Sequence, residues 1–309
     1  MRLSDAEARG RAGVRDVLRG LPDGAPVVVG VSGGADSLAL AACTAFVADR
    51  DRHDARAVVV DHGLQQRSAD VAARAVEQVR GLGLAAEAVA VAVGTEGGPE
   101  ASARDARRAA LLEAAGPDGV VLLAHTLDDQ AETVLVGLGR GSGPRSLAAM
   151  APRSGPWRRP FLGLRRADTE AVCVAHDLAW WTDPHNTDPA FRRARVRHEV
   201  LPLLEDVLGG GVAAALARTA DRLRDDTDLL DRLAAEVDDP ADTAVLAALH
   251  PALRSRVLHR VALDAGATPG ELTAVHVAAL ERLVTQWHGQ DRVELPGHVS
   301  VRRVGGRLV

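Results

Sequence analysis

The feature of the sequence that most constrains the fold is an apolar run that ends in a glycine pair, an acid and two hydroxyls. Residues 27–31 read Val-Val-Val-Gly-Val, and residues 32–37 read Ser-Gly-Gly-Ala-Asp-Ser. β-Branched residues are stiff at χ1 and favour a buried strand, whereas Ser37 and the Leu-Ala-Leu-Ala-Ala that follows it favour a helix. The pattern therefore predicts a strand that leads through a short glycine-rich loop into a helix.

This loop has the composition of a phosphate-binding site. Gly33 and Gly34 allow backbone N–H groups to approach a ligand closely. The hydroxyls of Ser32 and Ser37 and the positive end of the new helix would complete the site. An ordinary strand-turn-helix is the alternative, but the full Ser-Gly-Gly-x-Asp-Ser string after a strand favours nucleotide binding, with Asp36 as part of the chemistry.

The chain has 309 residues, which is enough for two domains of ordinary size. Its apolar runs are much shorter than the roughly 18 residues that a membrane span requires. Residues 1–7 lack the apolar core of a secretory signal, so we expect a cytoplasmic protein. The two cysteines, Cys43 and Cys173, lie among small and apolar residues and are expected to be buried free thiols.

All 37 basic residues of the chain are arginines, because the sequence contains no lysine. A Walker-type loop needs a lysine on the phosphates, and Schiff-base enzymes and self-adenylating ligases need a lysine amine. The sequence therefore excludes these mechanisms. A nucleotide bound at residues 32–37 must be held by backbone N–H groups and arginines.

Positive charge is concentrated in two runs, although the net charge of the chain is -5. Residues 140–166 contain seven arginines and no acid, and a second run covers residues 192–197. Such runs are often a solvated face, but here they suggest a local surface for phosphate or nucleic acid. Trp157 and Phe161 interrupt the first run and suggest a base-stacking or docking surface.

Strand and helix patterns alternate along the first two thirds of the chain and predict a doubly wound, mostly parallel α/β sheet with right-handed crossovers. After Gly209-Gly210-Gly211 the pattern changes to Ala/Leu-rich helices, and then to short strands joined by turns. We therefore expect a catalytic domain at 1–208 and a smaller, mainly helical domain with a short β tail at 209–309.

Polar residues also follow two of the other predicted strands. Asp61 and His62 end the second strand, and residues 125–133, His-Thr-Leu-Asp-Asp-Gln-Ala-Glu-Thr, follow the fourth. Ligands of doubly wound sheets bind at the carboxyl ends of the strands, so position favours a functional role for these residues. For Asp61 and His62 the alternative is a turn acid and a capping histidine.

Within residues 125–133, a helix that starts near Asp128 would place Asp129 and Glu132 together on one face. Acids in a first turn also cap free N–H groups and offset the helix dipole, and this explains Asp128. It does not explain why four polar residues crowd one strand end, namely His125, Asp129, Gln130 and Glu132. A hard cation at this point could be held mostly by substrate phosphates.

These motifs together resemble the tRNA(Ile)-lysidine synthetase family of the PP-loop, or N-type ATP pyrophosphatase, superfamily. The loop at 32–37 resembles the loop of the whole superfamily, and narrower motifs follow in the order of the family across residues 25–205. They are Val60-Asp61-His62-Gly63-Leu64, Glu100-x3-Arg104-x2-Arg107, His125-x2-Asp128-Asp129-Gln130-x-Glu132-Thr133, Arg140-Gly141-Ser142-Gly143, Arg159-Pro160 and Trp181-x-Asp183-Pro184-x-Asn186. The resemblance implies an adenine nucleotide α-hydrolase-like fold, in the short form of the family that lacks a further carboxyl-terminal domain.

The resemblance implies a two-step reaction at the wobble cytidine of the CAU anticodon of tRNA(Ile). ATP adenylates the ring carbonyl oxygen and releases pyrophosphate, and the side-chain amine of free L-lysine then displaces AMP to leave lysidine. ATP is therefore the implied cofactor, with magnesium held mainly through its phosphates. The sequence leaves open whether the chain forms a homodimer, and how the second domain contacts the tRNA.

The resemblance also implies roles for the matching residues. The carboxylates of Asp129 and Glu132 would receive the cationic ends of lysine, and a neighbouring acid or His125 would take the proton from the amine. The implied catalytic residues are Asp36, His125, Asp129 and Glu132. The implied nucleotide-binding residues are Ser32, Gly33, Gly34, Asp36, Ser37, Asp61, His62 and Arg104. The implied lysine- and tRNA-binding residues are Asp129, Glu132, Arg107, Arg140, Arg193 and Arg197.

The sequence departs from the pattern of the family at three positions. Gln65 stands where a basic residue is usual, Ala194 where Asn is usual, and Arg108 where Tyr is frequent. These departures bear on the roles of residues 62–68 and 192–197 more than on the family.

Three other readings of the loop at 32–37 are less consistent with the sequence. A PP-loop tRNA thiolase usually needs paired cysteines, and the two cysteines here have no Cys-x-x-Cys partner. Amidotransferase relatives often carry a glutaminase nucleophile near the start, and none is apparent. An adenine-nucleotide-binding module would leave His125, Asp129 and Glu132 without a task.

Overall fold

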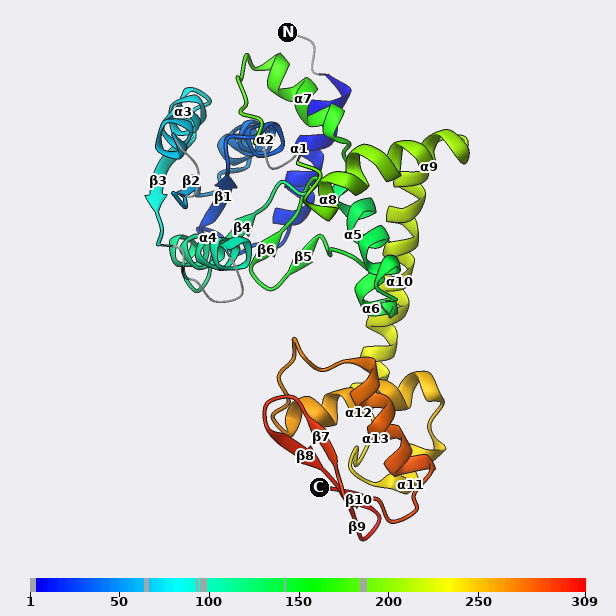
Figure 1. Cartoon of the computed structure of the whole chain (residues 1–309). Helices are drawn as coiled ribbons and strands as arrows, with labels where there is room; N and C mark the ends of the chain where they lie inside the picture. The colour runs from blue at the N-terminus through cyan, green and yellow to red at the C-terminus, as the bar shows by residue number, and fades with distance from the viewer. Residues whose placement is uncertain (1–3, 64–66, 93, 95–98, 142, 184–187) are drawn as a thin grey trace. The chain divides into compact units, whose positions relative to one another are not determined.

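The computed structural model describes residues 4–63, 67–92, 94, 99–141, 143–183 and 188–309, with backbone only at 99–101 (Figure 1). The chain divides into two compact units. The first comprises Met1–Arg140 and Ala149–Ala220, and the second comprises Gly141–Ala148 and Asp221–Val309. Along the chain, the later boundary between the units falls inside one long helix, α10 (Val212–Ala235).

The first unit is built around a six-stranded sheet with the order β3-β2-β1-β4-β6-β5. Strands β1, β2, β3, β4 and β6 are parallel, and β5 pairs antiparallel with β6. This confirms the predicted mostly parallel α/β sheet. In chain order the strands are β1 (Val27–Val31), β2 (Ala55–Asp61), β3 (Ala85–Ala90), β4 (Val120–Leu122), β5 (Arg153–Ser154) and β6 (Trp157–Arg158).

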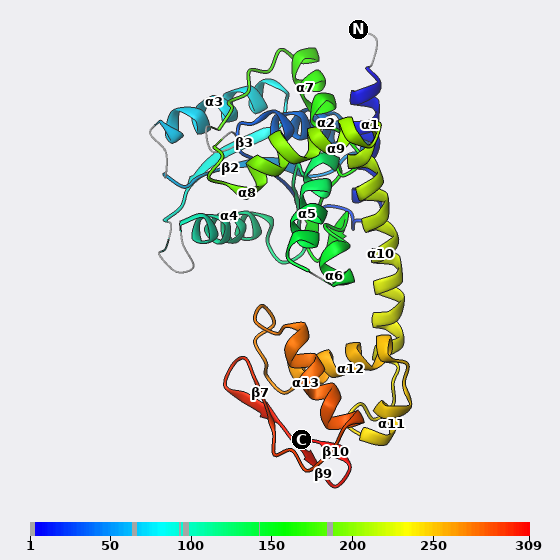
Figure 2. The same cartoon turned by 45° about the vertical axis from the view of Figure 1, so that its right-hand side comes forward.

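Helices cover both faces of this sheet, with α4 on the side of the strands opposite to α2 and α3 (Figure 2). Val27 and Val29 of β1 face the larger core, whereas Val28 faces the core beneath α4. Alternate residues of a strand point to opposite faces, so a strand buried on both sides must be apolar throughout. The helices on the larger core are α1 (Asp5–Leu18), α2 (Ala35–Asp51), α3 (Ser68–Gly81) and α7 (Arg166–Ala175), and the opposite face is covered by α4 (Pro99–Ala115).

The hairpin of β5 and β6 was not expected from the sequence, and it changes the interpretation of the aromatic residues beside it. Trp157 is only 5% exposed, and Phe161 is fully buried in the larger core. The guanidinium of Arg108 lies 4.3 Å from the centroid of the Trp157 ring. The prediction of a base-stacking surface at these two residues is therefore wrong. The prediction of free, buried cysteines is confirmed for both Cys43 and Cys173.

Residues 192–207, which contain the second arginine run, form α8 (Arg192–Arg195), a π-helical turn at Val196–Val200 and α9 (Leu201–Val207). Pro202 has no N–H, and its ring would clash with the carbonyl of the residue four positions earlier in a regular α-helix. The wider π-helical turn relieves this clash, and such turns are frequent at functional sites. Together with α5 (Leu127–Gly139), whose Ala131 packs against Leu201, this segment adds a further layer to the first unit.

The second unit is mainly helical and ends in two short hairpins, which confirms the predicted helices with a β tail. Its core contains Leu246, Leu258 and Leu280. Arg254 ties two of its helices together, because its guanidinium lies 2.7 Å from a carboxylate oxygen of Glu281. The elements are α6 (Pro144–Leu147), the later part of α10, α11 (Thr243–Ala248), α12 (Pro251–Asp264), α13 (Ala274–Thr285), β7 (Val293–Leu295), β8 (Val299–Val301), β9 (Arg303–Val304) and β10 (Arg307–Leu308).

In the described part of the chain, no single helix is long and apolar enough to cross a membrane, and only the helix pair Arg192–Val207 and Val212–Ala235, bent by 97°, meets both criteria together.

Candidate active site

Two of the three polar clusters expected from the sequence, at residues 32–37 and 125–133, meet at the carboxyl ends of β1 and β4. These two strands are neighbours in the sheet, and the strand order reverses between them, since β2 and β3 lie on the other side of β1. Ligands of doubly wound sheets bind at such a reversal. A cavity of about 610 Å³ lies here and is lined by residues of both loops, among them Ser32, Asp36, His125 and Asp129.

The loop after β1 is held in shape by its own hydroxyls. The Ser37 hydroxyl donates to the Gly34 carbonyl at 2.9 Å and accepts from the Ser32 N–H at 3.1 Å. Gly33 has φ +81°, and a Cβ there would lie 3.1 Å from Cγ1 of Val71, so this position requires glycine. Helix α2 starts at Ala35, earlier than predicted, and its first N–H groups lie at the cavity wall.

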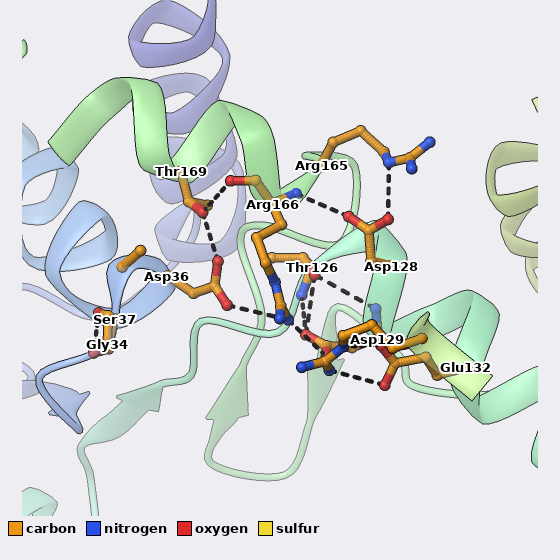
Figure 3. Close-up of polar contacts among 12 residues, drawn as sticks. Gly34, Asp36, Ser37, Thr126, Asp128, Asp129, Glu132, Arg165, Arg166 and Thr169 are labelled. Carbon is orange, nitrogen blue, oxygen red and sulfur yellow. Dashed lines mark hydrogen bonds and ion pairs between the residues drawn. The ribbon is translucent and has the colours of Figure 1, made fainter. Parts of the chain in front are cut away.

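Asp36 lies in the first turn of α2 and faces the cavity. Its Oδ1 accepts from the Thr169 hydroxyl at 2.5 Å, and its Oδ2 lies 3.4 Å from Nη2 of Arg166 (Figure 3). Burial raises the pKa of the Asp36 carboxyl above its ordinary value, and the charge of Arg166 only partly opposes this. The carboxylate is therefore held in place, but its charge is only partly neutralised. This is expected of a group that binds a cationic ligand.

Asp129, rather than Asp128, is the capping acid of α5. Its Oδ2 accepts from the backbone N–H of Thr126 at 2.8 Å, and the Thr126 hydroxyl caps the helix in return (Figure 3). Asp128 instead accepts from the backbone N–H of Arg166 at 2.8 Å and pairs with Arg165 at 2.9 Å. The capping role predicted for Asp128 is therefore wrong, and Asp128 joins α5 to the start of α7.

Glu132 and Arg197 form a buried, bidentate ion pair. The Glu132 side chain is fully buried, and its two oxygens accept from Nε and Nη2 of Arg197 at 2.6 and 3.0 Å. The same Nη2 lies 3.3 Å from Oδ1 of Asp129. Burial raises the pKa of the Glu132 carboxyl, while its hydrogen bonds to Arg197 lower it. Asp129 and Glu132 thus share one face of α5, as predicted, with an arginine between them.

His125 follows β4 and is the most strongly perturbed base in the cavity. Burial lowers the pKa of its imidazole to about 4, Asp129 raises it, and the charges of Arg159 and Arg107 lower it further. Its Nδ1 is buried and has no hydrogen-bond partner within the described residues. At neutral pH the ring is therefore uncharged, and its buried Nδ1 is unpaired among the described residues.

We expect this histidine to make the protein less stable in mild acid. The unfolded chain takes up a proton at an ordinary histidine pKa near 6.5, whereas the folded chain resists it until about pH 4. The stabilisation is therefore present above pH 6.5 and is lost as the pH falls towards 4, by about 2 kcal/mol between pH 7 and pH 5. Urea unfolding of the wild type and of His125→Gln at both pH values checks this.

The variant should lose correspondingly less stability over this range. The carboxyls of Asp36 and Glu132, whose raised pKa values favour the folded state as the pH falls, contribute equally to both proteins and cancel in the comparison. Equal losses in the two proteins would contradict the assignment.

A wall of arginines borders the other side of the cavity. Desolvation lowers the pKa of Arg107, and the like charges of Arg104 and Arg108 lower it further. The pKa of Arg159 is lowered for the same two reasons. The mutual repulsion of such crowded guanidiniums decreases when a polyanion, such as a triphosphate or a nucleic-acid backbone, binds between them. The arginines that line the cavity are Arg104, Arg107, Arg108, Arg159, Arg166, Arg193 and Arg197.

Five predicted site residues are not among the described residues that line the cavity, namely Gly33, Asp61, His62, Glu132 and Arg140. Asp61 ends β2, where it accepts from the Gly63 N–H at 3.0 Å, and neither Asp61 nor His62 is among the described residues that line the cavity. Arg140 is exposed at the C-cap of α5 and is also missing from that lining. Residues 64–66, 142 and 184–187, which include Gln65 and parts of three motifs, lie outside the described residues.

Sequence reasoning missed two residues that contact Asp36, and both come from α7. The sequence marks Arg166 only as part of an arginine run, although its guanidinium lies 3.4 Å from Asp36 and 3.5 Å from Asp129. Thr169 is fully buried and carries no sequence signal of its own. Both depend on the packing of α7 against α2, which no local pattern reveals.

Two family descriptions match the chain. The PP-loop domain matches residues 14–204, and the TilS substrate binding domain matches residues 242–309. The chain is 53% identical to the tRNA(Ile)-lysidine synthase of Thermobifida fusca, over 97% of this chain and 95% of that protein. It is 52% identical to the synthase of the same name from Streptomyces coelicolor, over 94% and 86%, and 52% identical to that from Mycobacterium tuberculosis, over 90% and 87%.

Among solved structures, the U34-tRNA thiolase NcsA from Methanococcus maripaludis, determined with its 4Fe-4S cluster, aligns with a TM-score of 0.58. It is 19% identical, over 71% of this chain and 79% of that chain. At this identity the likeness shows the fold alone.

Within the residues described here, no group of three or more His, Cys, Asp or Glu side chains could hold a metal ion.

Proposed function

The chain belongs to the tRNA(Ile)-lysidine synthase family, and from this premise we propose that it ligates free L-lysine to the wobble cytidine of the CAU anticodon of tRNA(Ile), using ATP. The reaction passes through an adenylated cytidine and releases pyrophosphate and then AMP. The observation that carries the proposal is the meeting of the glycine-rich loop and the acidic cluster in one cavity, beside a wall of arginines.

We assign the first step to the loop after β1 and to the arginine wall. The N–H groups at the start of α2, with the hydroxyl of Ser32, hold the phosphates of ATP, and the Ser37 hydroxyl keeps the loop in shape through its hydrogen bond to the Gly34 carbonyl. Arg104 and Arg107 neutralise the charge that develops on the leaving pyrophosphate, a task that other enzymes give to lysine. Gly33 and Gly34 allow the close approach.

We assign the second step to the cluster after β4. Asp129 attracts an ammonium group of lysine, and His125, uncharged at neutral pH, accepts the proton that leaves the side-chain amine as it attacks. The electron pair of the amine forms the new carbon–nitrogen bond at the cytidine ring, and the oxygen leaves with AMP. Arg193, which lines the cavity, and the exposed Arg140 are proposed contacts for the tRNA backbone.

Magnesium fits this site through the substrate rather than through a protein cage. Asp36 is the carboxylate beside the phosphate loop, and one such ligand together with phosphate oxygens and water suffices for this cation. Magnesium bound in this way would neutralise the phosphates during adenylation. His62 and Asp61, at the neighbouring strand end, are proposed contacts of the adenosine.

We further propose that residues 1–208 act as the catalytic domain and residues 209–309 as the tRNA-binding domain of a cytoplasmic enzyme. The family matches at 14–204 and 242–309 lie on either side of this boundary and support it. The segment Gly141–Ala148 belongs to the second compact unit although it precedes the boundary in sequence. It therefore connects the end of α5 with the second unit along the chain.

The test of the function is the transfer of radiolabelled lysine to an unmodified tRNA(Ile) transcript with a CAU anticodon. We expect incorporation that requires both ATP and the tRNA, with AMP and pyrophosphate formed in equal amounts. A transcript with a CAU anticodon from methionine tRNA serves as the matched control. Absence of incorporation by folded protein would overturn the proposal, and sulfur transfer to the same transcript would favour a thiolase instead.

A further inference from the structure

Residues 178–182 follow α7 and form neither a helix nor a strand. The segment begins at the buried Leu178, whose N–H donates to the Cys173 carbonyl at 2.9 Å. Its later residues line the same cavity as the loop after β1, namely Trp180, Trp181 and Thr182. The sequence motif that opens with Trp181 is part of the family pattern, yet neither step of the proposed reaction gives it a role.

A side chain of α3 holds this segment as a neighbouring strand would. Oε1 of Gln78 accepts from the Ala179 N–H at 2.7 Å, and Nε2 of Gln78 donates to the Ala179 carbonyl at 3.0 Å. One primary amide thus satisfies both backbone polar groups of a residue that lies outside any strand. Because Gln78 is half-buried on a helix of the larger core, the contact fixes the segment relative to that core.

The far end of the segment is bound to the loop after β1. The Trp181 N–H donates to the Gly33 carbonyl at 2.9 Å. The peptide between Gly33 and Gly34 is trans and planar, so its N–H points opposite to its carbonyl. The contact therefore directs the Gly34 N–H away from Trp181. Gly34 is the N-cap of α2 and lines the cavity, and this N–H is one of the donors that no carbonyl of the helix accepts.

This external contact supplies an order that the loop lacks by itself. Two consecutive glycines permit a close approach to a ligand, but they also leave the peptide between them free to rotate. The packing behind the loop is tight, because the space lined by Gly33, Gln78, Ala179 and Trp181 measures only about 10 Å³ and holds at most one water molecule. A shift of the segment is therefore transmitted to the Gly33–Gly34 peptide.

We propose that Gln78 is a positioning residue for the adenylation step, and that it acts through residues 179–181 to keep the Gly34 N–H facing the phosphates of ATP. The inference rests on the proposed function, because it concerns the first step of that reaction. A donor oriented in advance needs no reorganisation as charge develops on the leaving pyrophosphate. Loss of this orientation should therefore slow the chemical step more than it weakens the binding of ATP.

Gln78→Met tests the anchor, because methionine keeps the length of the side chain and removes its amide. We expect the rate of pyrophosphate release at saturating ATP to fall by about tenfold, and the half-saturating ATP concentration to stay within about threefold of the wild type. Glu77→Met is the matched control at the neighbouring, exposed position of α3, and it should keep the wild-type rate. Hydrogen exchange followed by mass spectrometry should show faster exchange at residues 178–182 of Gln78→Met, with β1 unchanged.

A second pair of variants tests the Trp181 N–H itself. Trp181→Ala and Trp181→Pro both lose the indole ring, but only proline also removes the N–H that binds the Gly33 carbonyl. We expect pyrophosphate release to be about tenfold slower in the proline variant than in the alanine variant.

Equal rates in the two Trp181 variants would overturn the inference, as would wild-type release or unchanged exchange at 178–182 in Gln78→Met. If the wild type releases no pyrophosphate with ATP and the tRNA(Ile) transcript, the proposed function itself fails, which is a different outcome.

Discussion

Replacing Asp36 by asparagine is expected to slow pyrophosphate release by about a hundredfold to a thousandfold while leaving the protein at least as stable as the wild type. The carboxylate faces the cavity beside the phosphate loop, where its charge is needed for the magnesium-bound phosphates proposed above. Burial raises its pKa, so the folded protein itself disfavours that charge. Asparagine keeps the oxygen that accepts from Thr169 and removes the unfavourable charge.

The two halves of this prediction are measured separately, by single-turnover pyrophosphate release and by urea unfolding. Asp51→Asn is the matched control, since Asp51 lies at the other end of the same helix and pairs with Arg15 at 2.8 Å. It should keep full activity. Asp36→Asn with wild-type pyrophosphate release would remove this loop from the mechanism, and a large loss of stability would show that Asp36 serves the fold.

Local sequence was informative for the loop that contains Asp36. The strand, the glycine pair and the acid at residues 27–37 are consecutive, and each reflects a backbone requirement that only a few residue types meet. Gly33 illustrates this, because its φ of +81° strains any other residue and a Cβ there would lie only 3.1 Å from Cγ1 of Val71. A motif of this kind can be read without knowledge of the rest of the fold.

The alternation of strands and helices and the helical second unit were predictable for a similar reason, since both depend on periodicity along continuous stretches. Local sequence patterns did not predict the contacts that join distant parts of the chain. The burial of Trp157 depends on a hairpin of very short strands, and that of Thr169 depends on the packing of α7. Asp128 and Asp129 are adjacent and chemically identical, so only the geometry of Thr126 and Arg166 distinguishes their roles.

The pairing of Glu132 with Arg197 is the clearest case, because the two residues are 65 positions apart and the pairing depends on a π-helical turn. Each residue was selected from the sequence as a candidate, yet both were assigned to the substrate. The sequence alone suggests two free carboxylates at this point. In the structure, the guanidinium of Arg197 contacts both Asp129 and Glu132 and offsets their negative charge.

We expect Arg197→Met to lower the free energy of unfolding by about 3–5 kcal/mol at pH 7.5, because it leaves the fully buried carboxylate of Glu132 without its partner. The double variant Glu132→Gln/Arg197→Met should recover at least about 2 kcal/mol of this loss, since no buried charge then remains unpaired. Urea unfolding of the wild type, both single variants and the double variant gives the coupling energy directly. Additive losses would contradict the pairing.

The pH dependence of the single variant provides an independent check on the same pair. Burial raises the pKa of Glu132 in the folded protein, and removal of Arg197 removes the hydrogen bonds that oppose this shift. A carboxyl with a raised folded-state pKa binds a proton before the unfolded chain does, so the cost of burying it diminishes as the pH falls. The defect of Arg197→Met should therefore be smaller at pH 5 than at pH 7.5, whereas the double variant, which lacks the carboxyl, should show no such relief.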